Sequence, residues 1–117
     1  MAAKPNIPAA EPLELASLIS VTEGGIASRV IVRTGGGSVT LFAFDVGEEL
    51  SEHTTPYEAL VVVLEGTLKL TVGGTPVQAV PGTVVRMPAG VPHAVESPGR
   101  AKMMLVMLGG RDSRQKD

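Results

Sequence analysis

Short runs of apolar and polar residues alternate along most of the chain, and each run ends at glycine or proline. The segment ASRVIVRT (27–34) is rich in β-branched residues, and SVTLFAFDVG (38–47) follows it after three glycines. Similar runs occupy 59–66, 67–74 and the chain from there to 108. Many short strands with regular turn residues and almost no helical period predict an all-β sandwich or barrel.

Two of the predicted strands are apolar on both faces. ALVVVLE (59–65) has no polar residue before its last position, and KMMLVML (102–108) has the same character. A strand with one solvated face should alternate with polar residues. The outer face of at least one sheet is therefore expected to be covered, either by the N-terminal arm or by a second subunit. We expect a homodimer built sheet to sheet.

The pattern divides the chain into an arm, a barrel and a tail. Residues 1–25 are predicted to be an N-terminal arm, loose over its proline-containing start and with a helical turn or edge strand at 13–20. Residues 26–108 are the predicted barrel, and the polar residues 109–117 are a flexible tail. Within the barrel, Glu65-Gly66 predicts a tight hairpin between two successive strands.

Composition excludes several kinds of protein. A chain of 117 residues suits one compact domain, and the absence of cysteine excludes disulfides, thiolate metal sites and a cysteine nucleophile. A net charge of −2, no basic stripe and 3% aromatic residues argue against nucleic-acid binding. The N-terminus lacks the apolar region of a secretory signal, and no apolar run approaches the ~20 residues that cross a bilayer. We therefore expect a cytoplasmic protein that does not bind membranes.

Acidic residues gather around one of the two histidines of the chain. Glu48, Glu49, Glu52 and Glu58 all flank His53. We interpret them as part of a solvated loop in preference to a mouth that attracts cations.

Both histidines stand in motifs that resemble those of the cupin superfamily, G-x5-H-x-H-x3-4-E-x6-G and G-x5-P-x-G-x2-H-x3-N. The matching residues are Gly47, His53, Thr55 and Gly66 for the first motif, and Gly82, Pro88, Gly90 and His93 for the second. The resemblance implies a cupin-type double-stranded β-helix, which is a jelly-roll barrel. It is closest to small one-domain cupins, whose activity is mostly unassigned.

The ligand set that the resemblance implies is incomplete. Cupins that bind metal usually offer three histidines and one glutamate, and His53 and His93 match the first and last of these positions. The second histidine position holds Thr55, the glutamate position holds Ala59, and the closing asparagine position holds Ser97. Two of the four expected ligands are therefore missing.

The metal prediction consequently has alternatives. Glu58 is a candidate third ligand, and two histidines with one carboxylate suit Fe(II) or Mn(II). Neighbouring strand residues point to opposite faces, so Glu58 should face away if Ala59 faces inward, unless a bulge intervenes. Two imidazoles alone are an incomplete set for Zn unless water or a substrate carboxylate completes it. The cofactor is one divalent transition metal (Fe, Mn, Zn or Ni) or none; in the latter case both histidines could be ordinary turn residues bonded to backbone.

The resemblance also implies a pocket in the barrel lumen. The residues expected to line it with the histidines are Thr55, Tyr57, Ala59, Val61, Met87, Met103 and Met107. For the last strand, the opposite face, with Met104, Val106 and Leu108, remains an alternative. Methionine is frequent at adaptable binding surfaces.

Three classes of function follow. The first is a metal-dependent enzyme, an oxygenase or isomerase acting on a small organic acid. The second is a metal-free module that binds or senses a small molecule. The third is a stability or interaction domain, whose lumen would be filled by side chains.

Overall fold

The computed structural model describes residues 6–109, which form one 3-10 turn and nine strands. These elements are η1 (Leu15–Leu18), β1 (Ile26–Thr34), β2 (Gly37–Phe44), β3 (Glu49–His53), β4 (Glu58–Glu65), β5 (Leu68–Val72), β6 (Thr75–Ala79), β7 (Val84–Met87), β8 (His93–Glu96) and β9 (Ala101–Leu108). In this part of the chain no helix has the length and apolarity needed to cross a membrane.

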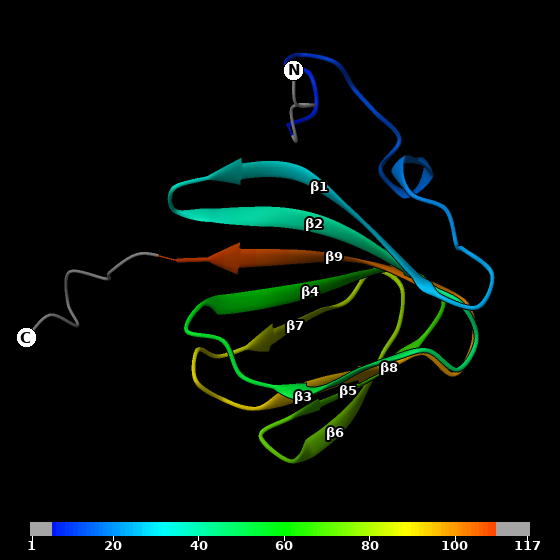
Figure 1. The fold of residues 1–117 in the computed structure, drawn as a ribbon, viewed down its shortest axis with the longest axis vertical. Coiled ribbons are helices and arrows are strands. Elements are labelled where there is room, and N and C mark those ends of the chain that lie inside the picture. The colour runs from blue at the N-terminus through cyan, green and yellow to red at the C-terminus, as the bar shows by residue number, and fades with distance from the viewer. Residues whose placement is uncertain (1–5, 110–117) are drawn as a thin grey trace, which may run out of the picture.

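The strands form two antiparallel sheets, one of five strands in the order β1-β2-β9-β4-β7 and one of four in the order β3-β8-β5-β6. Figure 1 shows the two sheets facing each other, with β1 at one edge and the turn η1 lying outside the larger sheet. The all-β barrel expected from the sequence is confirmed.

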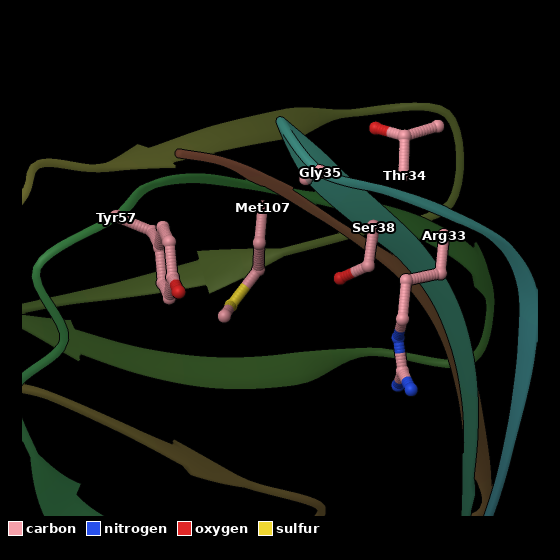
Figure 2. Close-up of a pocket in the computed structure, with 7 residues that line it drawn as sticks. Arg33, Thr34, Gly35, Ser38, Tyr57 and Met107 are labelled. Atoms are coloured by element: carbon pink, nitrogen blue, oxygen red, sulfur yellow. The ribbon is translucent and has the colours of Figure 1, made fainter. Parts of the chain in front are cut away.

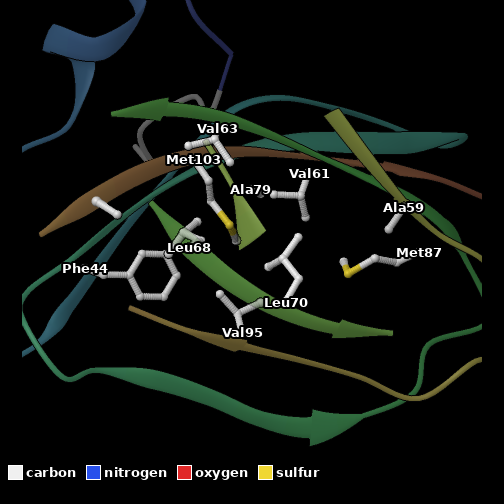
Figure 3. Close-up of a cluster of buried hydrophobic side chains, with 11 residues drawn as sticks. Phe44, Ala59, Val61, Val63, Leu68, Leu70, Ala79, Met87, Val95 and Met103 are labelled. Carbon is white, nitrogen blue, oxygen red and sulfur yellow. The ribbon is translucent and has the colours of Figure 1, made fainter. Parts of the chain in front are cut away.

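The main apolar core lies between the two sheets. On β5 the alternation predicted from the sequence holds: Leu68 and Leu70 are fully buried, whereas Lys69 between them is exposed. Figure 3 shows these leucines pointing toward side chains of the opposite sheet. The other buried members of this cluster are Phe44, Ala59, Val61, Val63, Ala79, Met87, Val95, Ala101 and Met103.

The outer face of the five-stranded sheet carries a second apolar cluster, and the N-terminal segment packs on it. Ile19 is buried with Leu41 of β2, and Leu64 of β4 and Met104 of β9 pack against the same cluster. The second apolar face of β4 is thus covered in part by the arm. Leu60 and Val62, farther along β4, are half-buried, and a homodimer through this face stays a prediction.

Asn6 and Ile7, at the start of the arm, are bonded to β1, whereas residues 8–12 are exposed. The Ile7 amide donates a hydrogen bond to the carbonyl of Ile31 at 2.8 Å, and the Arg33 amide donates to the side-chain oxygen of Asn6 at 2.9 Å. Both bonds use the free edge of β1. An exposed strand edge is prone to pairing with other chains, so this segment protects the sheet.

Two local expectations around β3 and β4 are wrong. The acidic run that we interpreted as a loop is partly the strand β3, with Glu49 and Glu52 exposed. Gly66 does not close a hairpin, because β4 lies in the five-stranded sheet and β5 in the other. Gly66 instead carries the chain between sheets with φ of +73°, and a Cβ there would overlap the carbonyl oxygen of Arg100.

Substitution of Gly66 by alanine should therefore destabilise the barrel. A positive φ and a backbone clash together should lower the free energy of unfolding by more than ~1 kcal/mol, as measured by urea denaturation. Gly25→Ala is the matched control, since nothing lies within 4 Å of a Cβ at that position. Equal stability of Gly66→Ala and wild type would contradict the close approach.

Asp45, just after β2, connects three separate parts of the chain. Its carboxylate accepts hydrogen bonds from the Gly24 amide at 2.6 Å, the Val46 amide at 2.8 Å and the Arg100 guanidinium at 3.0 Å. The bond from Gly24 is the first cause, followed by those from Val46 and Arg100, of an Asp45 pKa below its ordinary value of 3.8. These bonds hold the end of the arm and the β8–β9 connection against the barrel.

The effect of Asp45→Asn should depend on pH in a defined direction. Because folding lowers this pKa, the stabilisation is present above the unfolded value of 3.8 and is lost as the pH falls through the folded value. Thermal melting should show a lower Tm for the variant at pH 7 and a smaller difference below about pH 3.8. A difference in Tm that grows on acidification would contradict this role.

Candidate functional site

The two histidines lie directly opposite each other on neighbouring strands. His53 ends β3, His93 begins β8, and the two are paired across the antiparallel ladder. The register shifts between the pairs Leu50–Val95 and His53–His93, so β3 has one extra residue there. Without that bulge, Leu50 and His53 would point to opposite faces, because side chains alternate along a strand. The bulge allows both to face the barrel lumen.

The imidazole rings meet through their Nε2 atoms, which are 3.2 Å apart. The ring centroids are 4.4 Å apart and the ring planes are inclined at 71°. The Nδ1 of His53 lies 2.7 Å from the carbonyl of Ser51, and the Nδ1 of His93 lies 3.2 Å from the carbonyl of Val91. A carbonyl only accepts, so each neutral ring carries its proton on Nδ1 and directs the Nε2 lone pair toward the other ring. Two such lone pairs need a proton or a cation between them.

The two rings differ in their environment. His93 is 3% exposed, whereas His53 is exposed to solvent. Burial lowers the pKa of His93 below its ordinary value of 6.5; the bond to the Val91 carbonyl opposes this shift, and the nearby charge of His53 adds to it. The pair therefore spans the boundary between solvent and the interior.

Beneath the pair is an apolar cavity of about 250 Å³. Its lining residues are Leu50, His53, Thr55, Ala59, Met87, His93, Val95, Met103, Leu105 and Met107. Five expected pocket residues other than the histidines thus lie here: Thr55, Ala59, Met87, Met103 and Met107. The face of β9 that enters the lumen is the one with Met103, Leu105 and Met107.

Leu50 and Val95 were missed as lining residues. Val95 could have been found, because it stands two residues after His93 and so shares its face of the strand. Leu50 could not, since its orientation relative to His53 depends on the bulge.

Glu58, the candidate third ligand, is held away from the histidines. Its carboxylate accepts a hydrogen bond from Nε of Arg86 at 2.7 Å and another from the Ala89 amide at 3.1 Å. These bonds, with that from Arg86 the largest, lower the pKa of Glu58. Its neighbour Ala59 lines the cavity, so the alternation of the strand holds and Glu58 is on the opposite face.

Tyr57 and Val61 also lie outside the lumen. Tyr57 is 40% exposed and lines a separate, smaller cavity. Val61 is fully buried in the main core rather than at the cavity wall, as Figure 3 shows. Val61 shares the inward face of β4 with Ala59 but is part of the packed core, whereas Tyr57 lies before β4 begins.

At the mouth of the cavity, the side chains best suited to bind a metal are those of His53 and His93. Among residues 6–109 no group of three or more histidine, cysteine, aspartate or glutamate side chains gathers where it could hold a metal. Thr55 and Ala59, which stand at the other two ligand positions implied by the resemblance, do line the same cavity. These two positions of the chain therefore face the lumen, but the histidine and glutamate side chains that could bind metal there are replaced by Thr55 and Ala59.

Comparison with known proteins gives the family. The family model of the cupin domain matches residues 40–109, which is more than half of the chain. The protein therefore belongs to the cupin family.

Solved structures agree with this assignment. A conserved protein of unknown function from Streptococcus pyogenes is 28% identical, with 96% of this chain and 98% of that one covered and a TM-score of 0.85. A cupin superfamily protein from Desulfitobacterium hafniense is 32% identical, with coverages of 93% and 100% and a TM-score of 0.84. A cupin 2 conserved barrel domain protein from Leptotrichia buccalis is 36% identical over 82% of this chain and 47% of that one, with a TM-score of 0.79. No curated protein matches significantly.

The contact between the rings should be visible in the titration of His93. In protein kept with a chelator, His53→Ala removes one cause that lowers the His93 pKa, so this pKa should rise toward 6.5. Ring-proton NMR measures it directly, and Glu49→Gln, at the other end of β3, is the control. An unchanged or lower His93 pKa in His53→Ala would show that the rings do not interact.

Proposed function

We propose that the lumen is a pocket for a small molecule and that Nε2 of His53 and Nε2 of His93 hold one divalent transition metal at its mouth. The observation that carries this proposal is the 3.2 Å separation of two Nε2 atoms whose rings are both oriented by backbone carbonyls. The cavity of about 250 Å³ below them provides the space for the ligand.

The distance between the nitrogens fits two ligands of one metal. Zinc binds imidazole nitrogen at ~2.0–2.1 Å, so two nitrogens at an angle between the octahedral and tetrahedral values would be separated by roughly 2.8–3.4 Å. The observed 3.2 Å lies in this interval. Metal-bound histidines usually donate their other ring N–H to a carbonyl or carboxylate, as both rings do here.

The small number of protein ligands influences the chemistry. Imidazole suits Fe, Ni and Zn, and Mn accepts it together with oxygen ligands. With two protein donors, most coordination positions remain for water and for oxygen atoms of the ligand. A metal bound there would act as a Lewis acid on such an oxygen.

The chain's own residues would select the ligand. The lining of the lumen is aliphatic and thioether-rich below the two histidines, so it favours a ligand with an apolar body. Thr55 is the one hydroxyl side chain among the lining residues. An oxygenase or isomerase acting on a small organic acid would use this same arrangement.

A metal-free binding module is the second candidate, and one observation favours it. Two of the four positions where the family can carry ligands hold Thr55 and Ala59, which give at most a hydroxyl. In that case the imidazoles would orient the ligand by hydrogen bonds. The third class, a domain with a filled lumen, is disfavoured by the cavity. A cytoplasmic location and the absence of nucleic-acid and membrane partners stay predictions.

Metal content measured by mass spectrometry tests the proposal. Tag-free protein incubated with Fe, Mn, Zn or Ni and then desalted should retain near-stoichiometric metal, and the His53→Ala, His93→Ala double variant should retain none. Glu58→Gln is the matched control, because the Glu58 carboxylate is bonded to Arg86, and it should retain metal like wild type.

Two outcomes would contradict the metal site. One is wild-type protein that retains no metal under any of these conditions. The other is a double variant that binds as much metal as wild type. A thermal shift with small organic ligands that needs no metal would then support the metal-free module.

A further inference from the structure

A second cavity adjoins the lumen on the inner side of the five-stranded sheet. It has a volume of about 150 Å³, and its lining residues are Arg33, Thr34, Gly35, Gly37, Ser38, Tyr57 and Met107. Met107 lines both this cavity and the lumen. Figure 2 shows Tyr57, Met107, Ser38 and Arg33 following one another along it.

The strand register explains why these residues adjoin the lumen. Arg33 pairs with Ser38, Ser38 with Met107, and Met107 with Ala59, which in turn pairs with Met87. Residues paired across neighbouring strands point to the same face of a sheet. One row of side chains therefore runs from the Arg33 guanidinium past the Ser38 hydroxyl to Met107 at the apolar lumen. With strands ~4.8 Å apart, Arg33 and Met107 are separated by about 10 Å.

We propose that this second cavity is the subsite for the anionic group of the ligand, so that the pocket as a whole takes a small amphipathic carboxylate. The carboxylate pairs with Arg33, and the apolar body crosses Met107 into the lumen. The proposal rests on the lumen being a ligand pocket, but it does not require a metal there.

The charge distribution supports an anion at this position. Within residues 6–109, the ion pairs join Arg86 to Glu58, Arg100 to Asp45 and Lys102 to Glu65, and none of them includes Arg33. A guanidinium offers a planar fork of donors that matches a carboxylate.

Two hydroxyl groups add to the subsite. Ser38 and Tyr57 line the cavity with Arg33, and neither hydroxyl has a hydrogen-bond partner among the described residues. Each can donate one hydrogen bond to a carboxylate oxygen.

The loop between β3 and β4 connects the two cavities. It places Thr55 in the lumen and Tyr57 in the second cavity, and the Tyr57 amide donates to the Thr55 hydroxyl at 3.3 Å. The Tyr57 ring occupies the space over Gly109, where a Cβ would lie 2.5 Å from the ring. This packing holds the Tyr57 ring at the wall of the second cavity.

Calorimetric binding of octanoate and 1-octanol to the full chain tests the proposal. These probes share an apolar body and differ in charge. Wild type should bind octanoate roughly tenfold or more tightly than octanol, as expected for charge-assisted hydrogen bonds. Arg33→Gln should weaken octanoate binding by a similar factor and leave octanol binding unchanged, whereas Arg33→Lys should restore part of it.

Arg86→Gln is the matched control, since Arg86 is an exposed arginine already paired with Glu58. Folding of Arg33→Gln should be preserved because its amide, not its side chain, bonds to Asn6. Equal binding of the two probes by wild type, equal losses in Arg33→Gln and Arg86→Gln, or no octanoate binding by wild type would each overturn the proposal.

The same samples separate this proposal from the metal site. Arg33→Gln should retain metal like wild type, and the His53→Ala, His93→Ala variant should still prefer octanoate to octanol. If the wild-type protein retains no metal but still prefers octanoate to octanol, only the proposed metal site at His53 and His93 is refuted. Normal metal loading with no preference between the probes would refute only the anion subsite.

Discussion

The pairing of β3 with β8 is the constraint on which the candidate site depends. These strands place His53 directly opposite His93, and one extra residue in β3 turns His53 to the same side as Leu50. Opposed residues on antiparallel strands have Cβ atoms only ~4.5–5.5 Å apart, so two imidazoles there must interact. Backbone carbonyls of Ser51 and Val91 then fix which nitrogen of each ring faces the other. Two nucleophilic nitrogens are thus held together at the solvent boundary of an apolar cavity.

The rest of the barrel surrounds this histidine pair with packed side chains and forms the second cavity beside the lumen. The lumen is continuous with the main core, since Met87 and Met103 belong to both the cavity wall and the buried cluster. Along the inner face of the five-stranded sheet, one row of paired residues leads from the lumen past Met107 to Arg33. The imidazole pair is positioned by the pairing of β3 with β8, and Arg33 by the register of β1, β2 and β9 in the other sheet.

Part of this arrangement follows from the sequence alone. Alternation and regular turn residues predict the all-β fold, and the resemblance to the cupin motifs implies that both histidines belong to one site. The bulge in β3 was not predictable, because it depends on how two distant strands pair, and without it Leu50 could not be assigned to the lumen. For the same reason the hairpin predicted at Gly66 is wrong. Local turn chemistry does not reveal that the chain passes there to the other sheet.

The metal-binding role of the histidine pair can be measured most directly by X-ray absorption at the metal edge of zinc-loaded protein. The chain has two histidines and no cysteine, so the donors it can offer are well defined. The geometry predicts a first shell with two imidazole nitrogens and oxygen atoms in the remaining positions. A shell with fewer than two imidazoles would contradict the site, and a third imidazole would show that the metal is shared with another chain instead of held by one barrel.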